Sequence, residues 1–77
     1  MIKRGDLVRI KSLKDLVFVF ESMCISAVEQ REGVFVLQAI VRPKQPITLS
    51  GVALSLSDSV IVGADKIELA NSGISSN

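Results

Sequence analysis

Apolar and polar side chains alternate with a period of two along most of this chain, and this pattern constrains the fold more than any other feature. In the stretch GDLVRIKS, Val8 and Ile10 alternate with Arg9 and Lys11, as expected for a strand with one buried face. The same period continues through REGVFVLQAIVR, GVALSLSDS and KIEL. β-Branched residues dominate these runs, which favours strands over helices. We therefore expect an all-β fold.

The breaks between the alternating runs predict how the strands connect. Turns are expected near residues 12–14, 30–33, 43–46, 50–51 and 63–65. A flat sheet without helices would leave one apolar face uncovered, whereas a strongly bent antiparallel sheet closes its edges and encloses that face. We expect a single small barrel of about five to six strands over residues 1–70. The polar tail NSGISSN, residues 71–77, is expected to be disordered.

The chain is short for a domain that folds alone, so an additional stabilising element is expected. It has 77 residues, no histidine and one cysteine, Cys24, which excludes an intrachain disulfide and leaves only oxygen ligands for a metal. The acidic residues are scattered singly, so no metal, no cofactor-binding site and no small-molecule cofactor are expected. Oligomerisation remains. We therefore expect a homo-oligomer or a complex with a protein partner.

Cysteine usage and hydropathy also bear on location. A lone thiol suits a reducing compartment, which predicts a cytoplasmic protein. The N-terminal stretch MIKRGDLVRIKS is too charged for the apolar core of a secretion signal. The longest apolar run, residues 16–20, is far too short to span a membrane. No membrane association is expected.

The stretch DLVFVFESMCISAVEQ, residues 15–30, differs from the other runs because both of its strand faces are apolar. Antiparallel strands with one wet face do not need this. Either a loop of the same chain covers the second face, or another subunit does. The candidate interface consists of Leu16, Val17, Phe18, Val19 and Phe20. The pattern then continues through Met23 and Ile25, with a bulge or bend predicted at Glu21–Ser22.

Two stretches near the ends of the chain resemble SH3-like small barrels. GDLVRI, residues 5–10, is similar to their first strand, often written G-D-x-V-x-[IVL]. VIVGADKIEL, residues 60–69, resembles their close: a strand, a single 3-10 turn and a short final strand. Gly63 stands where such turns often carry proline, and Asp65 keeps the acidic position. The resemblance implies a barrel with a short 3-10 turn near residues 63–66.

SH3-like barrels include peptide binders, RNA- and ribosome-binding modules and accessory domains of enzymes, so the fold does not decide the function. Binding of Pro-rich peptides needs an aromatic groove, and this chain has no Trp and no Tyr. Its own P-x-x-P segment, residues 43–46, is interpreted as a surface loop between strands. A local basic patch is the candidate nucleic-acid contact: Arg9, Lys11, Lys14, Arg42 and Lys44.

The basic patch has an alternative interpretation as the solvated face of an edge strand, where Lys and Arg block edge-to-edge association. A net charge of +1 and the lack of interleaved aromatic residues favour this interpretation. Catalysis is not expected, because Cys24 lies in an apolar run typical of a packing residue. The sequence predicts a non-enzymatic binding or assembly module that self-associates. The alternatives are a nucleic-acid-binding barrel and an accessory structural subunit of a larger complex.

Overall fold

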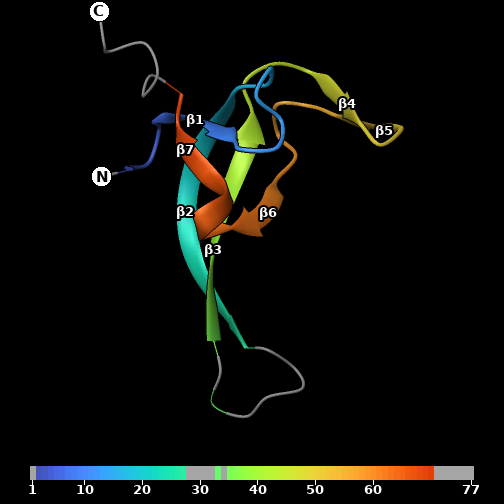
Figure 1. Ribbon diagram of the computed structural model, residues 1–77. Helices are drawn as coiled ribbons and strands as arrows, with labels where there is room; N and C mark the ends of the chain where they lie inside the picture. The colour runs from blue at the N-terminus through green and yellow to red at the C-terminus, as the bar shows by residue number, and fades with distance from the viewer. Residues whose placement is uncertain (1, 28–32, 34, 71–77) are drawn as a thin grey trace, which may run out of the picture.

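The structure is a computed structural model that describes residues 2–27, 33 and 35–70. The tail predicted to be disordered, residues 71–77, lies outside the described residues, as does most of the turn predicted at 30–33. The described elements are seven strands and one short 3-10 helix (Figure 1). In chain order they are β1 (Leu7–Ile10), β2 (Phe18–Ala27), β3 (Phe35–Pro43), β4 (Ile47–Leu49), β5 (Val52–Leu54), β6 (Val60–Gly63), η1 (Ala64–Lys66) and β7 (Ile67–Leu69).

Five of the strands form one antiparallel sheet with the order β6-β3-β2-β1-β7. The two remaining strands, β4 and β5, form a separate antiparallel hairpin. The all-β antiparallel fold is therefore confirmed, and so is the 3-10 turn near residues 63–66. The sheet is not closed into a barrel, because its hydrogen-bonded order ends at β6 and β7. The 3-10 helix η1 connects the two edge strands, β6 and β7, which do not pair with each other.

The buried core lies on one face of the five-stranded sheet, called the inner face here; the opposite face is called the outer face. Phe18 is completely buried, and its register partners on both sides, Val8 on β1 and Pro43 on β3, are buried too. One row further along β2, Phe20 pairs with buried Val41. Loop residues and strands cover this core with partly buried side chains: Ile2, Leu13, Leu16, Ile47, Leu49, Val60, Val62 and Leu69.

The register of β2 and β3 shifts between Phe20 and Ser22, which confirms the bulge predicted at Glu21–Ser22. A bulge inserts one extra residue into one strand, bends it and increases its local twist. Because the extra residue is Glu21, the apolar alternation of β2 continues on the same face after the bulge. Met23 therefore pairs with Ala39 and Ile25 with Leu37 on the inner face.

The segment between β3 and β6 is organised by two tight turns. Ser50 and Gly51 connect β4 to β5 with positive φ values of 49° and 80°, the backbone that two-residue type I′ hairpins need. The second turn, residues 55–58, ends β5 at Leu54, which is earlier than the alternation of GVALSLSDS predicts. The Asp58 carboxylate accepts a hydrogen bond from the Ser55 backbone N–H at 2.7 Å, and such a side-chain bond competes with strand pairing.

A pair of identical substitutions on strands of the same sheet tests the assignment of inner and outer faces. Ile67 on β7 is 6% exposed and Ile61 on β6 is 57% exposed. Ile67→Val should lower the free energy of unfolding by about 0.5–1.5 kcal/mol, because it leaves a small cavity in the core. Ile61→Val should change it by less than about 0.5 kcal/mol. Urea denaturation of both variants measures the difference, and equal losses would contradict the assignment.

Candidate protein-interaction surface

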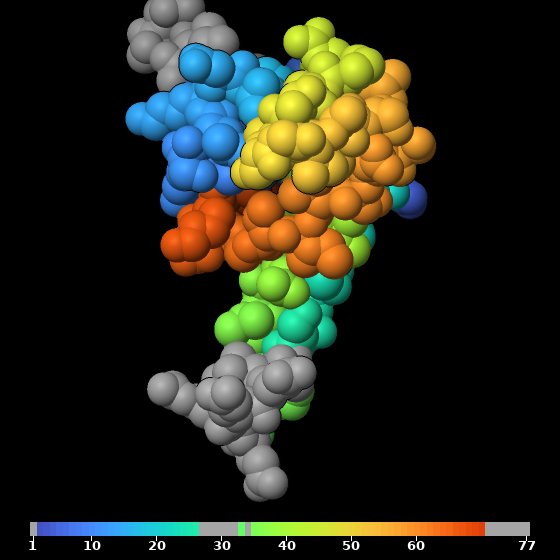
Figure 2. Space-filling view, turned by 90° about the vertical axis from the view of Figure 1, so that its right-hand side faces the viewer, coloured from blue at the N-terminus to red at the C-terminus, as the bar shows by residue number. Residues whose placement is uncertain are grey.

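The β2–β3 hairpin extends well beyond the strands that flank it. β1 pairs with β2 only at Phe18 and Val19, and β6 pairs with β3 only from Gln38 to Val41. The remaining part, Ser22–Ala27 of β2 with Phe35–Leu37 of β3, is called the hairpin tip here. It projects from the body of the molecule in Figures 1 and 2. Within the described residues, no strand other than β3 pairs with β2 along the tip.

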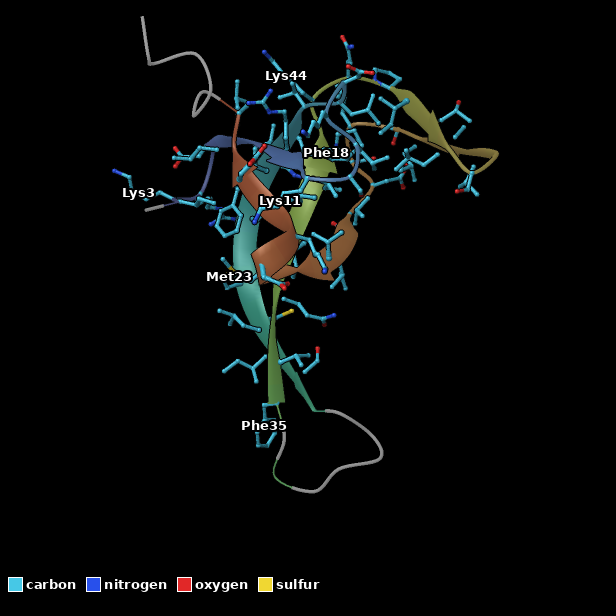
Figure 3. The ribbon with its side chains drawn as sticks, viewed as in Figure 1. Lys3, Lys11, Phe18, Met23, Phe35 and Lys44 are labelled. Carbon is cyan, nitrogen blue, oxygen red and sulfur yellow. The ribbon has the colours of Figure 1, made fainter. Side chains whose placement is uncertain are left out.

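The inner face of the hairpin tip carries large apolar side chains that are exposed to solvent. Ile25 is 70% exposed, Phe35 63% and Leu37 51%, and Met23 is also exposed. These four side chains are called the apolar stripe. Because β2 and β3 pair in register along the tip, the stripe continues the inner face of the sheet directly outward from the core. Figure 3 labels Met23 near the body and Phe35 at the far end of β3.

The apolar stripe is more exposed than the candidate interface expected at Leu16–Phe20. Phe18 and Phe20 are buried in the core of the chain itself, so these two side chains are not available to a partner. Leu16 and Val17 precede β2 and are partly buried, and Leu16 packs against the core. Val19 is half-buried on the outer face, opposite Arg42 of β3. Whether Leu16, Val17 and Val19 contact a partner stays a prediction.

The outer face of the hairpin tip is more polar. Cys24 is half-buried on this face and pairs with Gln38 of β3. The Ser26 hydroxyl donates a hydrogen bond to the Gln38 side-chain oxygen at 2.5 Å. Val36 is the exposed apolar residue of this face at the tip. The two faces therefore differ, and only the inner one presents an unbroken row of large apolar side chains.

The structure does not gather the five candidate nucleic-acid residues into one free basic patch. Arg9 donates a hydrogen bond from Nη2 to the Ala70 carbonyl oxygen at 2.7 Å in a partly buried setting. Arg42 forms an ion pair with Glu21, with its Nε 3.6 Å from the carboxylate Oε1. These two guanidinium groups therefore hold contacts within the chain. They also lie beside acidic residues on the outer face, since Arg9 has Glu68 as its register partner on β7.

The other three candidates, Lys11, Lys14 and Lys44, are exposed. Lys11 lines a surface groove between the end of β1 and η1, together with Lys66, Asp65 and Val62. Lys44 lines a smaller groove with Asp15 and Ile47. Both grooves contain a carboxylate as well as a lysine, which reduces the local positive potential that would attract a phosphate backbone.

Other kinds of site find no support in the described part of the chain. Within residues 2–27, 33 and 35–70, no three Cys, Asp or Glu side chains lie close enough to hold a metal ion. Over those residues, no helix has the length and apolar character needed to cross a lipid bilayer. Pro43 is the last residue of β3 and is fully buried, whereas Lys44, Gln45 and Pro46 are exposed, so the P-x-x-P segment does not present both of its prolines to a partner.

Comparison of the chain with protein-family models, curated proteins and solved structures found no match. The assignment of the site therefore depends on the geometry of the chain itself. The apolar stripe was visible in the sequence as two period-two runs, one through Met23 and Ile25 and one through Phe35 and Leu37. The alternation shows that these residues share a face. It does not show that the strands flanking the hairpin are too short to cover them.

The contact of Arg9 with Ala70 can be separated from a binding role by a stability measurement. Arg9→Met keeps most of the aliphatic stem but removes the hydrogen bond to Ala70, so it should lower the free energy of unfolding by about 1–2 kcal/mol. Lys11→Met, at an exposed position just past the end of β1, is the matched control. It should change the stability by less than about 0.5 kcal/mol. Equal stability of the two variants in urea denaturation would show that Arg9 has no structural role.

Proposed function

We propose that this chain is a non-enzymatic assembly module, a small SH3-like barrel of the cytoplasm that self-associates through its apolar stripe. The fold assignment is supported by the strand order β6-β3-β2-β1-β7 and by η1 directly before the last strand. The location is supported by the single free thiol. The observation that carries the function is the apolar stripe itself, which leaves four large side chains in water on a chain of 77 residues.

The size of the hydrophobic gain favours a self-association of moderate strength. Full burial of one large apolar side chain stabilises a protein by about 1.5–3 kcal/mol, and these side chains are already partly buried. A symmetric dimer brings two stripes together, so the gross gain is at most roughly 8–12 kcal/mol. The entropic cost of association is about 4–15 kcal/mol. The balance is consistent with a reversible dimer whose population depends on concentration.

The two alternatives have less support. A nucleic-acid-binding role would use a basic patch from which Arg9 and Arg42 are withdrawn by contacts within the chain. An accessory subunit of a larger complex would cover the same apolar stripe with a different protein. Self-association is the simpler proposal, because it needs no second component to bury the stripe.

Two leucines with equal exposure provide a matched test of the proposed function. Leu37 in the apolar stripe and Leu56 in the connection between β5 and β6 are both 51% exposed. Leu37→Glu places a charge beside Ile25, its partner on β2, and should raise the dissociation constant of the dimer about 30-fold, the effect of losing about 2 kcal/mol. Leu56→Glu should leave it unchanged. Size-exclusion chromatography with light scattering over a range of concentrations measures both.

Circular dichroism of the same samples separates dissociation from unfolding, because both variants should keep the strand spectrum of the parent chain. If the parent chain stays monomeric at high concentration, self-association is wrong. If Leu56→Glu weakens association as much as Leu37→Glu does, the interface does not lie on the apolar stripe.

A further inference from the structure

The edge of β2 that points away from β3 is unpaired along the hairpin tip. The last backbone contacts between β2 and the N-terminal segment are at Phe20, whose N–H donates to the Asp6 oxygen and whose carbonyl accepts from the Gly5 N–H, both at 2.9 Å. Within the described residues, no strand pairs with this edge from Ser22 to Ala27. An exposed strand edge presents a row of unpaired N–H and C=O groups that another strand can pair with.

The register shows which backbone groups face outward on this edge. The Lys44 N–H donates to the Val17 carbonyl at 3.1 Å, so even-numbered residues of β3 direct their backbone groups toward β2. Gln38, which pairs with Cys24, belongs to that set. Backbone groups alternate in direction along a strand, so Met23 and Ile25 direct their N–H and C=O groups away from β3. These two residues also belong to the apolar stripe.

The composition of this edge suits a second copy of the same strand. The sequence from Ser22 to Ala27 is SMCISA, with no charge, no Pro and no Gly. Natural edge strands are commonly protected by Lys, Pro, a bulge or an inward-pointing charge. The bulge at Glu21 protects only the start of this segment. β7, the strand that ends the five-stranded sheet on this side, is protected differently, since it carries Glu68 and follows Lys66.

We propose that two copies of this chain associate by antiparallel pairing of their β2 edges over Ser22–Ser26, which joins the two hairpin tips into one continuous four-stranded sheet. This inference specifies the geometry of the self-association proposed above and rests on it. A two-fold axis perpendicular to the sheet keeps the inner faces of both copies on the same side, because paired residues in a sheet share a face. The two apolar stripes then lie side by side.

The structure also selects the register of the pairing. If the two-fold axis passed beside Met23, Ser26 would stand opposite Phe20 of the second copy. The backbone N–H and C=O of Phe20 are already bonded to Asp6 and Gly5 of its own chain. An axis beside Cys24 avoids this conflict. Ser22 then faces Ser26 of the second copy, Met23 faces Ile25, and the two Cys24 residues face each other on the outer face. No charged side chain stands opposite a like charge in this register.

Amide hydrogen exchange tests the edge pairing independently of the side chains. The amides of Met23 and Ile25 point outward, so they should exchange rapidly in dilute solution. When about nine-tenths of the chains are dimeric they should exchange about tenfold more slowly, because only the monomeric tenth exposes them. The amides of Cys24 and Ser26 point toward β3 and should be protected at every concentration. They provide the internal control for an intact hairpin.

Cysteine crosslinking gives a second, separate readout. Cys24 lies on the face opposite to the apolar stripe, so bismaleimidoethane should link two Cys24 thiols in an edge-paired dimer but not in a dimer packed face to face through the stripe. The control variant Cys24→Ser/Ser57→Cys carries its thiol on the exposed turn before β6, and it should give at least about tenfold less covalent dimer. Leu37→Glu with Cys24 retained should also lose the crosslink, since its association is weakened.

The possible outcomes separate this inference from the proposed function. Slowed exchange at Met23 and Ile25, together with the Cys24 crosslink, supports both. A dimer by light scattering that shows neither keeps the proposed function and overturns edge pairing. A chain that stays monomeric at high concentration overturns both, and it would leave an extended segment of a different protein as the occupant of this edge.

Discussion

The pairing of β2 with β3 is the interaction on which the rest of the structure depends. It is the longest strand pair of the described chain, running from Phe18–Pro43 to Ala27–Phe35. Every other strand of the main sheet attaches directly or indirectly to it: β1 and then β7 on the β2 side, and β6 on the β3 side. Because these additional strands have only three or four residues each, they cover one half of the hairpin. Core and exposed surface are therefore two parts of one continuous sheet face.

The bulge at Glu21 lets a single alternating pattern serve both halves. Without an extra residue the apolar set of β2 would change faces after Phe20, since Met23 is an odd number of residues away. With the extra residue, the same face that buries Phe20 against Val41 goes on to present Met23 and Ile25. The extra residue itself is held on the outer side by its ion pair with Arg42, at 3.6 Å. One local irregularity thus aligns the exposed stripe with the core.

Most strand positions and the bulge were predictable because each depends on local alternation, and the 3-10 turn followed from the resemblance of residues 60–69 to the close of SH3-like barrels. The extent of cover was not predictable, because it depends on how far neighbouring strands reach along the hairpin. Phe18 and Ile25 have similar apolar contexts in the sequence, yet one is fully buried and the other is 70% exposed. The candidate basic residues illustrate the same limit. The Arg9 contact with Ala70 joins positions that are 61 residues apart, and no local pattern indicates it.

The hairpin tip combines two features that destabilise an isolated hairpin: an exposed apolar face and an unpaired strand edge. An isolated two-stranded hairpin is only marginally stable in water, and stability generally needs a third strand or a packed face. The hairpin tip lacks both within the described chain: its inner face exposes Ile25 and Phe35, and its β2 edge has no partner strand. A chain that needed only a stable monomer could end the hairpin near Ala39, where β6 still gives cover. Instead, the alternation of large apolar residues continues to Phe35, beyond the part of β3 that pairs with β6. In the proposed edge-paired dimer, a second hairpin tip supplies the third strand to this edge and sets the two apolar stripes side by side.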